Sequence, residues 1–340
     1  SATAAEPDEE NRQMTEAELR RELETRERLM QTFQGQEGIM TDQWRVYKEA
    51  IGCLQAGRTP LRLCLQASAG TGKSFLLETL FLWATLNGHN VKAAAPTGIA
   101  AARLRMPRTP LSATTLHYLC GLSIDGESKI DPSNPADEGF QRLAGMTVLI
   151  IDEASMIDDR TWLWLRDQLS SVGAAARQHV STVSSIAGKH PDEDSFGRVH
   201  ILVAMDLKQL PPATSNPPFI AGDPEFLTVF EFRVLRQNRR LAVGSNEEEQ
   251  QALDTFHGVL EDVAHGKPTP RVREALVAAY ARGAQQNQET VGFESSTACV
   301  AKRRYRDRWN GKVLTRIGKH YGRALRAKPL LLAHVYQKQW

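Results

Sequence analysis

The sequence predicts an α/β fold with a doubly wound, mainly parallel sheet. Beyond Gly35, short apolar runs alternate with longer stretches of helical character, and this alternation is typical of strand–helix–strand units. The apolar runs end in polar or glycine-rich residues, which is where doubly wound sheets build their ligand sites. We expect strands at residues 61–66, 91–95, 148–152 and 199–205, with helices after most of them.

The chain is long enough for two domains, because single cores rarely grow beyond about 250–300 residues and this chain has 340. A Glu- and Arg-rich stretch at 15–30 predicts a surface helix. Five prolines at residues 211–224 predict a domain boundary near residue 222. The expected segments are an N-terminal extension at 1–40, a first domain at 41–222 with an insertion at about 173–198, and a partial second domain at 223–340.

The composition is that of an ordinary globular protein, with 41% hydrophobic and 24% charged residues. No apolar run approaches the length of a membrane span, and the first ten residues lack the pattern of a secretory signal, so we expect an intracellular protein without a membrane partner. The four cysteines are scattered, and their spacing predicts neither a zinc site nor a disulfide framework.

Charge is distributed unevenly along the chain. Residues 1–30 hold nine acids and five bases, whereas residues 301–340 hold twelve Lys or Arg against the single acid Asp307. Aromatic residues are interleaved with the bases of the second segment, and such a segment could neutralise phosphates and stack on bases. A solvated helical face with aromatic anchors is the alternative, and the sequence leaves both open.

Residues 67–74 read ASAGTGKS and lie between an expected strand and an amphipathic helix at 75–87. A phosphate-binding loop requires this context. Gly70 and Gly72 allow the backbone to curl so that its N–H groups and the helix N-terminus face a phosphate. Ala67 stands where the motif usually has its first glycine, and a chance glycine-rich turn is the alternative. The sequence therefore predicts a P-loop nucleotide site.

Three chemical groups complete the predicted site. Lys73 supplies a point charge to the β- and γ-phosphates of ATP, and Ser74 offers its hydroxyl to Mg²⁺. An apolar run at 148–151 ends in Asp152 and Glu153, and paired acids at the end of a buried strand are costly unless they hold a cation or do chemistry. Asp152 is the expected partner of Mg²⁺, and Glu153 is the expected base that activates water. The predicted loop contacts of ATP are Ala69, Gly70, Thr71, Gly72, Lys73 and Ser74.

Further segments resemble, in order, the motifs of the PIF (petite integration frequency) family of DNA helicases, which are related to the RecD-like branch of superfamily-one motors. They read PTGIAA at 96–101, TTLH at 114–117, DEASMI at 152–157 and QLPP at 209–212. The resemblance covers about residues 40–245. It implies two RecA-like motor domains, ATP and Mg²⁺ as cofactors, single-stranded DNA as the partner, and ATP-driven movement 5′ to 3′ along that strand. It also implies a location in the nucleus or mitochondrion.

The resemblance assigns roles to individual residues. Gln43 looks like the glutamine that reads the adenine edge, and a solvent-facing helix residue is the alternative. Two loops resemble those that grip the backbone of the DNA strand, and their hydroxyl, backbone N–H and imidazole groups can hydrogen-bond phosphates without reading sequence. The residues of these loops are Pro96, Thr97, Gly98, Thr115 and His117.

Two more roles concern the γ-phosphate. Gln209 looks like the family's γ-phosphate sensor, preceded by the usual acid Asp206, although residues 205, 207 and 208 depart from the common pattern. Residues 235–240 read LRQNRR and resemble the first strand of the second motor domain, whose closing arginine stabilises charge on the transferred oxygens. In this register Arg240 is the arginine finger, and Arg236 and Arg239 are rival candidates.

The later motifs of the family's second motor domain are not found after residue 240, so we expect that domain to be truncated. Helicases step by opening and closing a cleft between two motor domains. Three functions therefore stay open. They are an ATP-dependent DNA helicase, a helicase-derived nucleic-acid-binding or structural subunit of a larger assembly with little unwinding activity, and a different P-loop ATPase such as a loader.

Overall fold

The structure is a computed structural model that describes residues 12–57, 59–122, 130–180, 195–209, 212, 220, 224–239, 247–267 and 269–286. The chain divides into two compact units, residues 1–254 and 255–340. No helix among the described residues is long and apolar enough to cross a membrane.

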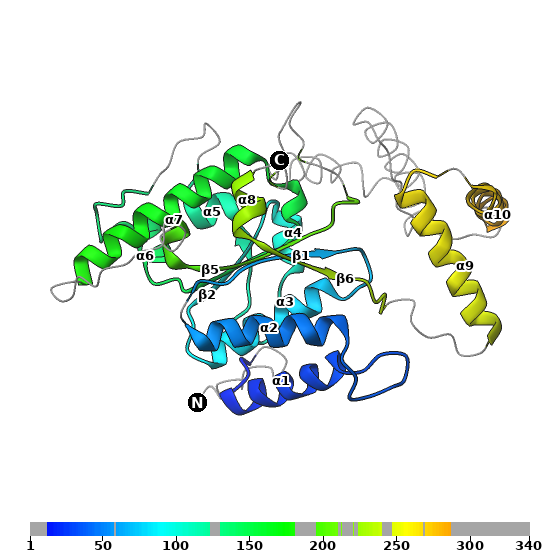
Figure 1. Ribbon diagram of the computed structural model, residues 1–340, viewed down its shortest axis with the longest axis horizontal. Helices are drawn as coiled ribbons and strands as arrows, with labels where there is room; N and C mark the ends of the chain where they lie inside the picture. The colour runs from blue at the N-terminus through cyan, green and yellow to red at the C-terminus, as the bar shows by residue number, and fades with distance from the viewer. Residues whose placement is uncertain are drawn as a thin grey trace, which may run out of the picture. The chain divides into compact units, whose positions relative to one another are not determined.

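A six-stranded parallel sheet forms the centre of the first unit, with the strand order β3-β2-β4-β5-β1-β6 (Figure 1). The strands are β1 (Arg62–Ala67), β2 (Val91–Ala95), β3 (Thr114–Thr115), β4 (Val148–Ile151), β5 (His200–Met205) and β6 (Glu231–Leu235). The α/β, RecA-like fold expected from the sequence is confirmed, and the four predicted strands are found within a residue of their expected ends.

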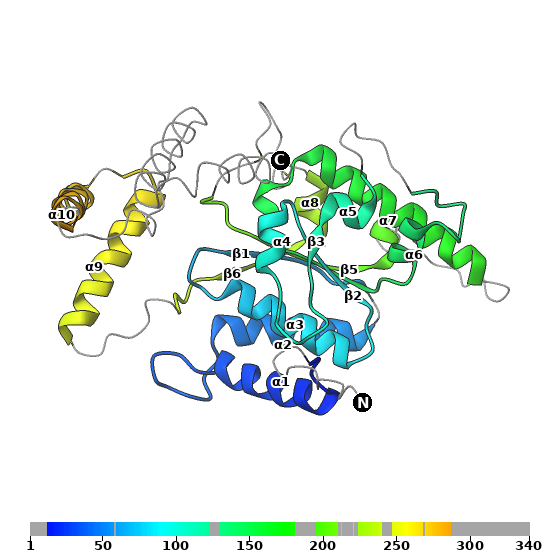
Figure 2. The same cartoon turned by 180° about the vertical axis from the view of Figure 1, so that it is seen from behind.

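Helices cover both faces of this sheet, as the views from the front and from behind agree (Figures 1 and 2). One face carries α1 (Glu16–Met30), α2 (Asp42–Ala56) and α3 (Lys73–Leu86). The other carries α5 (Leu116–Cys120), α6 (Glu138–Ala144), α7 (Asp159–Val180) and α8 (Pro224–Val229). The short α4 (Gly98–Arg103) follows β2. Parallel strands buried on both faces read as continuous apolar runs, which is why β4 could be recognised from its sequence VLII.

Successive strand residues enter two separate cores. Leu63 and Leu65 of β1 pack with the helices of the first face, whereas Cys64 between them packs with the second. The second core is centred on Trp162 of α7, whose ring lies 5.2 Å from the ring centroids of both Phe196 and Phe226. Aromatic rings at this distance and in tilted or edge-on orientation attract one another beyond the burial of their area.

The expected domain boundary near residue 222 is wrong, because the next strand belongs to the same sheet. β6 pairs in parallel with β1, with Cys64 opposite Phe232 and Ala67 opposite Leu235. Residues 224–254 therefore belong to the first unit, rather than beginning a second motor domain. Prolines mark a break in regular structure, but they do not distinguish a linker between domains from a crossover that returns the chain to its own sheet.

The predicted insertion at 173–198 is only partly accounted for. Residues 173–180 continue α7 without a break, and residues 195–198 form the short helix η4 (Ser195–Arg198). Residues 181–194 lie outside the described residues, as does the basic segment 301–340.

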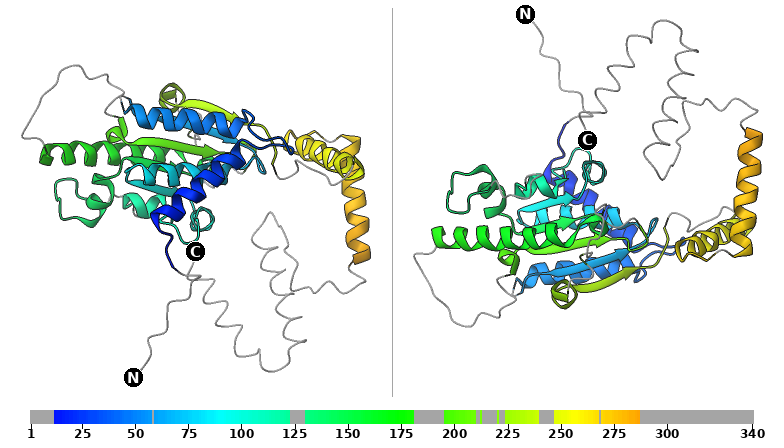
Figure 3. Two further views of the ribbon diagram at one scale, coloured as in Figure 1. Left: turned by 90° about the horizontal axis from the view of Figure 1, so that it is seen from below. Right: turned by 90° about the horizontal axis from the view of Figure 1, so that it is seen from above.

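The N-terminal helix predicted at 15–30 is α1, and it packs against the first unit. Thr15 caps it by accepting a hydrogen bond from the backbone of Glu18, while the Glu18 carboxylate accepts one from the Thr15 backbone. Viewed from below, α1 lies in front of the sheet (Figure 3). Within the second unit and at its margin, the described helices are α9 (Glu247–Ala264) and α10 (Pro270–Gln286).

Candidate nucleotide-binding site

The predicted phosphate loop connects β1 directly to α3. Ala67 is the last residue of the strand and is buried, so the alanine in place of glycine needs no unusual backbone conformation. Gly70 and Gly72 have φ angles of 87° and 76°, in the left-handed region that favours glycine. Thr71 closes the loop, because its hydroxyl donates to the carbonyl of Ser68 at 2.8 Å. The loop thus has the curled backbone that the motif predicted.

Lys73 begins α3 and meets the two predicted acids. Its Nζ lies 2.9 Å from Asp152 Oδ1 and 3.2 Å from Glu153 Oε1. Burial lowers the pKa of Lys73, but the facing carboxylates raise it by more, so its pKa lies above the ordinary value and the group stays charged. The structure therefore brings Lys73, Asp152 and Glu153 together at one end of the sheet, as the sequence predicted.

Glu153 has an unusual backbone. Its φ is 53°, which is costly for a residue with a side chain, and its N–H donates to Asp152 Oδ1 at 2.8 Å. The following residues form the short helix η2 (Ala154–Met156). Glu153 Oε2 is buried without a hydrogen-bond partner, a feature that in native sites requires an explanation such as a bound water or ion. This geometry is what a carboxylate that holds a water molecule would need.

The residues present fit a magnesium ion. Ser74 follows Lys73 in the first turn of α3 and is exposed, and the Asp152 carboxylate is buried across the loop. A hydroxyl and a carboxylate are the hard oxygen ligands that Mg²⁺ prefers alongside phosphate oxygens. The roles of Ser74 and Asp152 as metal ligands stay predictions.

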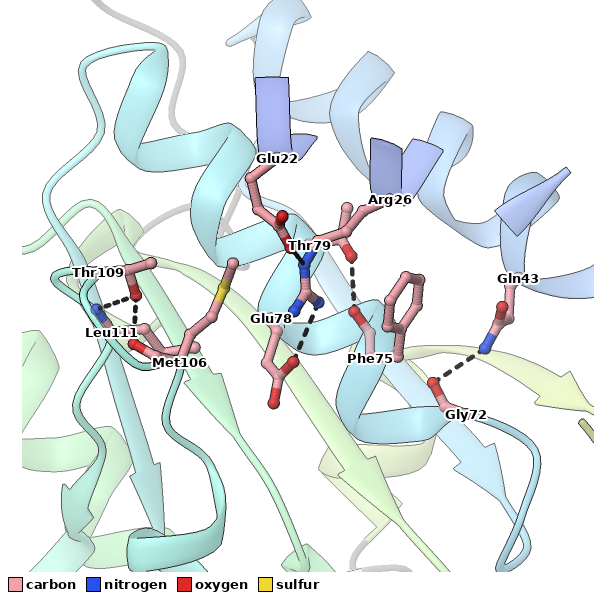
Figure 4. Close-up of polar contacts among 10 residues, drawn as sticks. All are labelled: Glu22, Arg26, Gln43, Gly72, Phe75, Glu78, Thr79, Met106, Thr109 and Leu111. Atoms are coloured by element: carbon pink, nitrogen blue, oxygen red, sulfur yellow. Dashed lines mark hydrogen bonds and ion pairs between the residues drawn. The ribbon is translucent and has the colours of Figure 1, made fainter. Parts of the chain in front are cut away.

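Gln43 lies in the first turn of α2 and is fully buried, so the alternative of a solvent-facing residue is wrong. Its Nε2 donates to the carbonyl of Thr71 at 3.0 Å. It also donates to the carbonyl of Gly72 at 2.9 Å (Figure 4). Its Oε1 is buried without a hydrogen-bond partner. Gln43 therefore contacts the backbone of the phosphate loop, and its contact with an adenine edge stays a prediction.

The close contact between Gln43 and the loop makes Gly72 sensitive to substitution. A Cβ atom at Gly72 would lie 2.1 Å from Gln43 Nε2, and the φ of 76° disfavours any side chain. We expect Gly72→Ala to lower the free energy of unfolding by about 1–3 kcal/mol, from backbone strain of about 1–2 kcal/mol and displacement of the Gln43 amide. Urea unfolding measures this change.

Gly52→Ala is the matched control. Gly52 lies within α2, where a Cβ atom meets nothing within 4 Å. Alanine in a helix interior is favoured over glycine by about 0.5–1 kcal/mol, so this variant should unfold at a slightly higher urea concentration. Equal midpoints for Gly72→Ala and the unchanged chain would contradict the close packing of the loop.

The predicted γ-phosphate sensor lies after β5. Gln209 is exposed and its Nε2 donates to Asp206 Oδ2 at 3.2 Å. The backbone N–H of Leu207 donates to Gln66 Oε1 on the neighbouring strand β1 at 3.3 Å. Because β5 lies between β1 and β4, the loop bearing Gln209 follows a strand flanked by those that carry the phosphate loop and the acidic pair.

The predicted DNA-contacting loops follow the adjacent strands β2 and β3, whose ends pair as Ala95 opposite Thr115. The hydroxyls of Thr97 and Thr115 cap α4 and α5, each accepting a backbone hydrogen bond at 3.2 Å. Of the remaining predicted contacts, Gly98 and His117 are exposed and Pro96 is half-buried. The structure therefore gathers all five residues at one edge of the sheet, while their contact with DNA stays a prediction.

Two residues beside these loops were not predicted. Tyr118 is 61% exposed, and the guanidinium of Arg142 lies 5.0 Å from its ring centroid. Both line an open cavity of about 470 Å³ that His117 also lines. The only signal in the sequence was the position of Tyr118 next to His117, since Arg142 comes from a separate helix, α6.

The predicted arginine finger, Arg240, lies outside the described residues. Of its two rivals, Arg236 is exposed. Arg239 directs its guanidinium to backbone carbonyls at the end of α1.

The guanidinium of Arg239 is held at the end of α1. Its Nη2 donates to the carbonyl of Met30 at 3.0 Å, and its Nη1 donates to those of Leu29 at 3.1 Å and Thr32 at 2.8 Å. In this arrangement the Arg239 guanidinium contacts the end of α1, and the identity of the arginine finger stays a prediction. The sequence did not indicate these contacts, because all three acceptors are backbone groups.

The chain is similar to known proteins over part of its length. A family model described as an AAA domain matches residues 42–178. The chain is 26% identical over 261 residues to the ATP-dependent DNA helicase PIF1 of Danio rerio, covering 76% of this chain and 35% of that protein. It is 28% identical over 235 residues to the ATP-dependent DNA helicase Pif1 of Bdellovibrio bacteriovorus, covering 67% of this chain and 45% of that protein.

Among solved structures, the crystal structure of Pif1 helicase from Candida albicans aligns with a TM-score of 0.46 and 23% identity, over 65% of this chain and 44% of that one. The chain therefore spans less than half the length of these relatives. The residues matched by the AAA-domain model include the phosphate loop and the acidic pair, and the chain is similar in sequence to ATP-dependent DNA helicases named PIF1 or Pif1.

Proposed function

We propose that this chain is the ATP-hydrolysing motor domain of a DNA helicase that moves 5′ to 3′ along a single strand. The observation that carries the proposal is the meeting of Lys73 with Asp152 and Glu153 beside a correctly curled phosphate loop. The names of the relatives, which are ATP-dependent DNA helicases, support the choice of substrate.

Lys73 is the group whose partners would change on nucleotide binding. Without nucleotide its charge is balanced by two carboxylates within 3.2 Å. A triphosphate offers a higher negative charge in the same place, so Lys73 exchanges carboxylate partners for phosphate oxygens. Ser74 and Asp152 would hold a magnesium ion, which would supply neutralising charge on the phosphate oxygens. Glu153, released from Lys73, then orients and deprotonates the attacking water.

The loops at the edge of the sheet are the proposed path of the DNA strand. Exposed His117 and Gly98, with the capped ends of α4 and α5, offer hydrogen-bond donors that suit phosphates and carry no sequence information. The sensor Gln209 and the finger Arg240 would connect hydrolysis to strand movement. A location in the nucleus or mitochondrion also stays a prediction, which cell fractionation would check.

The decisive measurement is ATP turnover by the 340-residue chain with and without a single-stranded oligonucleotide. We expect turnover to rise when the oligonucleotide is added and to vanish in Lys73→Ala, because the phosphates lose their point charge inside a buried site. A directional strand-displacement assay, with the single-stranded tail at either end, tests the 5′ to 3′ polarity.

Each of the other functions gives a different result. Failure to bind nucleotide at millimolar Mg-ATP would exclude an ATPase. Salt-dependent DNA binding that survives Lys73→Ala, together with negligible turnover in the unchanged chain, would indicate a helicase-derived binding subunit. Turnover that ignores DNA would indicate a different P-loop ATPase.

A further inference from the structure

Arg239 connects three elements around the phosphate loop. Its backbone N–H donates to the carbonyl of Gly70 at 2.8 Å, so the residue touches the loop directly. Its side chain then passes the loop, and its Cδ lies 3.5 Å from the position that a Cβ atom on Gly72 would take. The guanidinium ends among the three carbonyls of residues 29, 30 and 32, and lies 5.8 Å from the ring centroid of Phe33.

These contacts suit an arginine in particular. The last carbonyls of a helix have no partners within it and carry the negative end of the helix dipole. A guanidinium presents several N–H donors in a fixed fork, so it can contact the carbonyls of Leu29 and Met30 at the end of α1 together with that of Thr32 just beyond it. The positive charge is therefore favourable at the end of α1, although the three acceptors are uncharged backbone carbonyls.

A second set of contacts fixes the segment that carries Arg239. Asp42, the first residue of α2, accepts hydrogen bonds from the backbone N–H groups of Arg236 at 2.6 Å and Gln237 at 2.8 Å. The Gln237 side chain accepts one in return from the Asp42 backbone at 3.0 Å. The neighbouring Gln43 holds the other side of the phosphate loop. The segment 236–239 and the start of α2 therefore bind to each other, and both contact the phosphate loop.

The helix that receives Arg239 is itself fastened to the helix that starts at Lys73. Arg26 of α1 lies 2.7 Å from Glu22 and 3.0 Å from Glu78 of α3 (Figure 4). Its guanidinium also lies 4.7 Å from the ring centroid of Phe75. Tyr47 of α2 donates to Glu27 of α1 at 2.6 Å. α1 thus has fixed contacts with both helices that border the loop.

We propose that Arg239 is a positioning residue that holds the phosphate loop in its nucleotide-binding conformation by anchoring it to the end of α1. On this view α1 is a structural part of the nucleotide site rather than a separate extension. The inference rests on the proposed function, because it presumes that the loop binds a nucleotide. It gives a role to a residue that the motifs offered only as a rival candidate for the arginine finger.

The test is calorimetric titration of the full chain with MgADP. Arg239→Gln keeps a side chain of similar polarity but loses the charge and most of the donors. We expect its affinity for MgADP to fall on the order of tenfold, because part of the binding free energy must now order the loop. The kcat at saturating ATP should change much less than KM, whereas loss of an arginine finger would lower kcat by about a thousandfold or more.

Arg45→Gln is the matched control, because Arg45 is an exposed arginine on α2 and the substitution removes the same charge. It should bind MgADP like the unchanged chain. Arg239→Lys keeps the charge but cannot reproduce the fork, so we expect an intermediate affinity. That variant also serves if Arg239→Gln does not fold.

The outcomes separate the two proposals. If the unchanged chain does not bind MgADP, the proposed function is wrong. If the unchanged chain binds and both Arg239 variants, checked as folded by circular dichroism, bind equally well, the proposed function stands and the positioning role is wrong. A lower melting temperature of these variants with unchanged affinity for MgADP would likewise show that Arg239 only stabilises the fold, and the positioning role would be wrong.

Discussion

Glu153→Gln is expected to lower the rate of ATP hydrolysis by about 10²–10⁴-fold while nucleotide binding is retained. Gln has the size and hydrogen-bonding reach of Glu but cannot accept a proton from the attacking water. Since Glu153 Oε1 lies 3.2 Å from Lys73 Nζ, removing its charge also leaves Lys73 with one carboxylate partner fewer. MgATP should therefore bind as tightly as before or more tightly. Single-turnover phosphate release and a binding titration measure the two effects separately.

Glu24→Gln provides the control for charge. Glu24 is an exposed residue of α1, so this variant should keep the turnover of the unchanged chain. Turnover in Glu153→Gln within a factor of a few of the unchanged chain would show that another group activates the water. Loss of nucleotide binding in the same variant would instead show that Glu153 mainly supports the loop.

Much of the site could be predicted because its chemistry is local in the sequence. The phosphate loop lies in eight consecutive residues. The acidic pair directly follows β4, whose four residues are all buried. Parallel strands bring their carboxyl ends to the same edge of a sheet. That rule was enough to predict that Lys73 and Asp152, far apart in the chain, would meet.

The parts that could not be predicted depend on long-range pairing. The exposure pattern of β6 is that of an edge strand, and nothing in its five residues names β1 as its partner. The contacts of Arg239 use backbone carbonyls, which every residue has, so the sequence carries no sign of them. Gln43 was linked to the nucleotide through resemblance alone, and its contacts with Thr71 and Gly72 came from the structure.

Both β6 and Arg239 lie beyond the expected domain boundary near residue 222, and both belong to the first unit. β6 adds a strand to the sheet that carries the site, and Arg239 follows that strand after three residues. The backbone N–H of Arg239 donates to the carbonyl of Gly70 in the phosphate loop, so this segment still belongs to the surroundings of the site.

Trp162→Ala is expected to lower the free energy of unfolding by about 3–5 kcal/mol, the range for removal of a large aromatic side chain from a core. Trp162 is 2% exposed and its ring contacts those of Phe196, Phe226 and Phe230. Trp162 lies in α7, Phe196 in η4, Phe226 in α8 and Phe230 just after α8. The cavity left by the substitution would therefore remove packing contacts between several elements on this face of the sheet. Leu163→Ala, one residue along α7 and 37% exposed, should cost less than about 1 kcal/mol. Urea unfolding of both variants measures the difference, and equal midpoints would show that this aromatic cluster is not the core of that face.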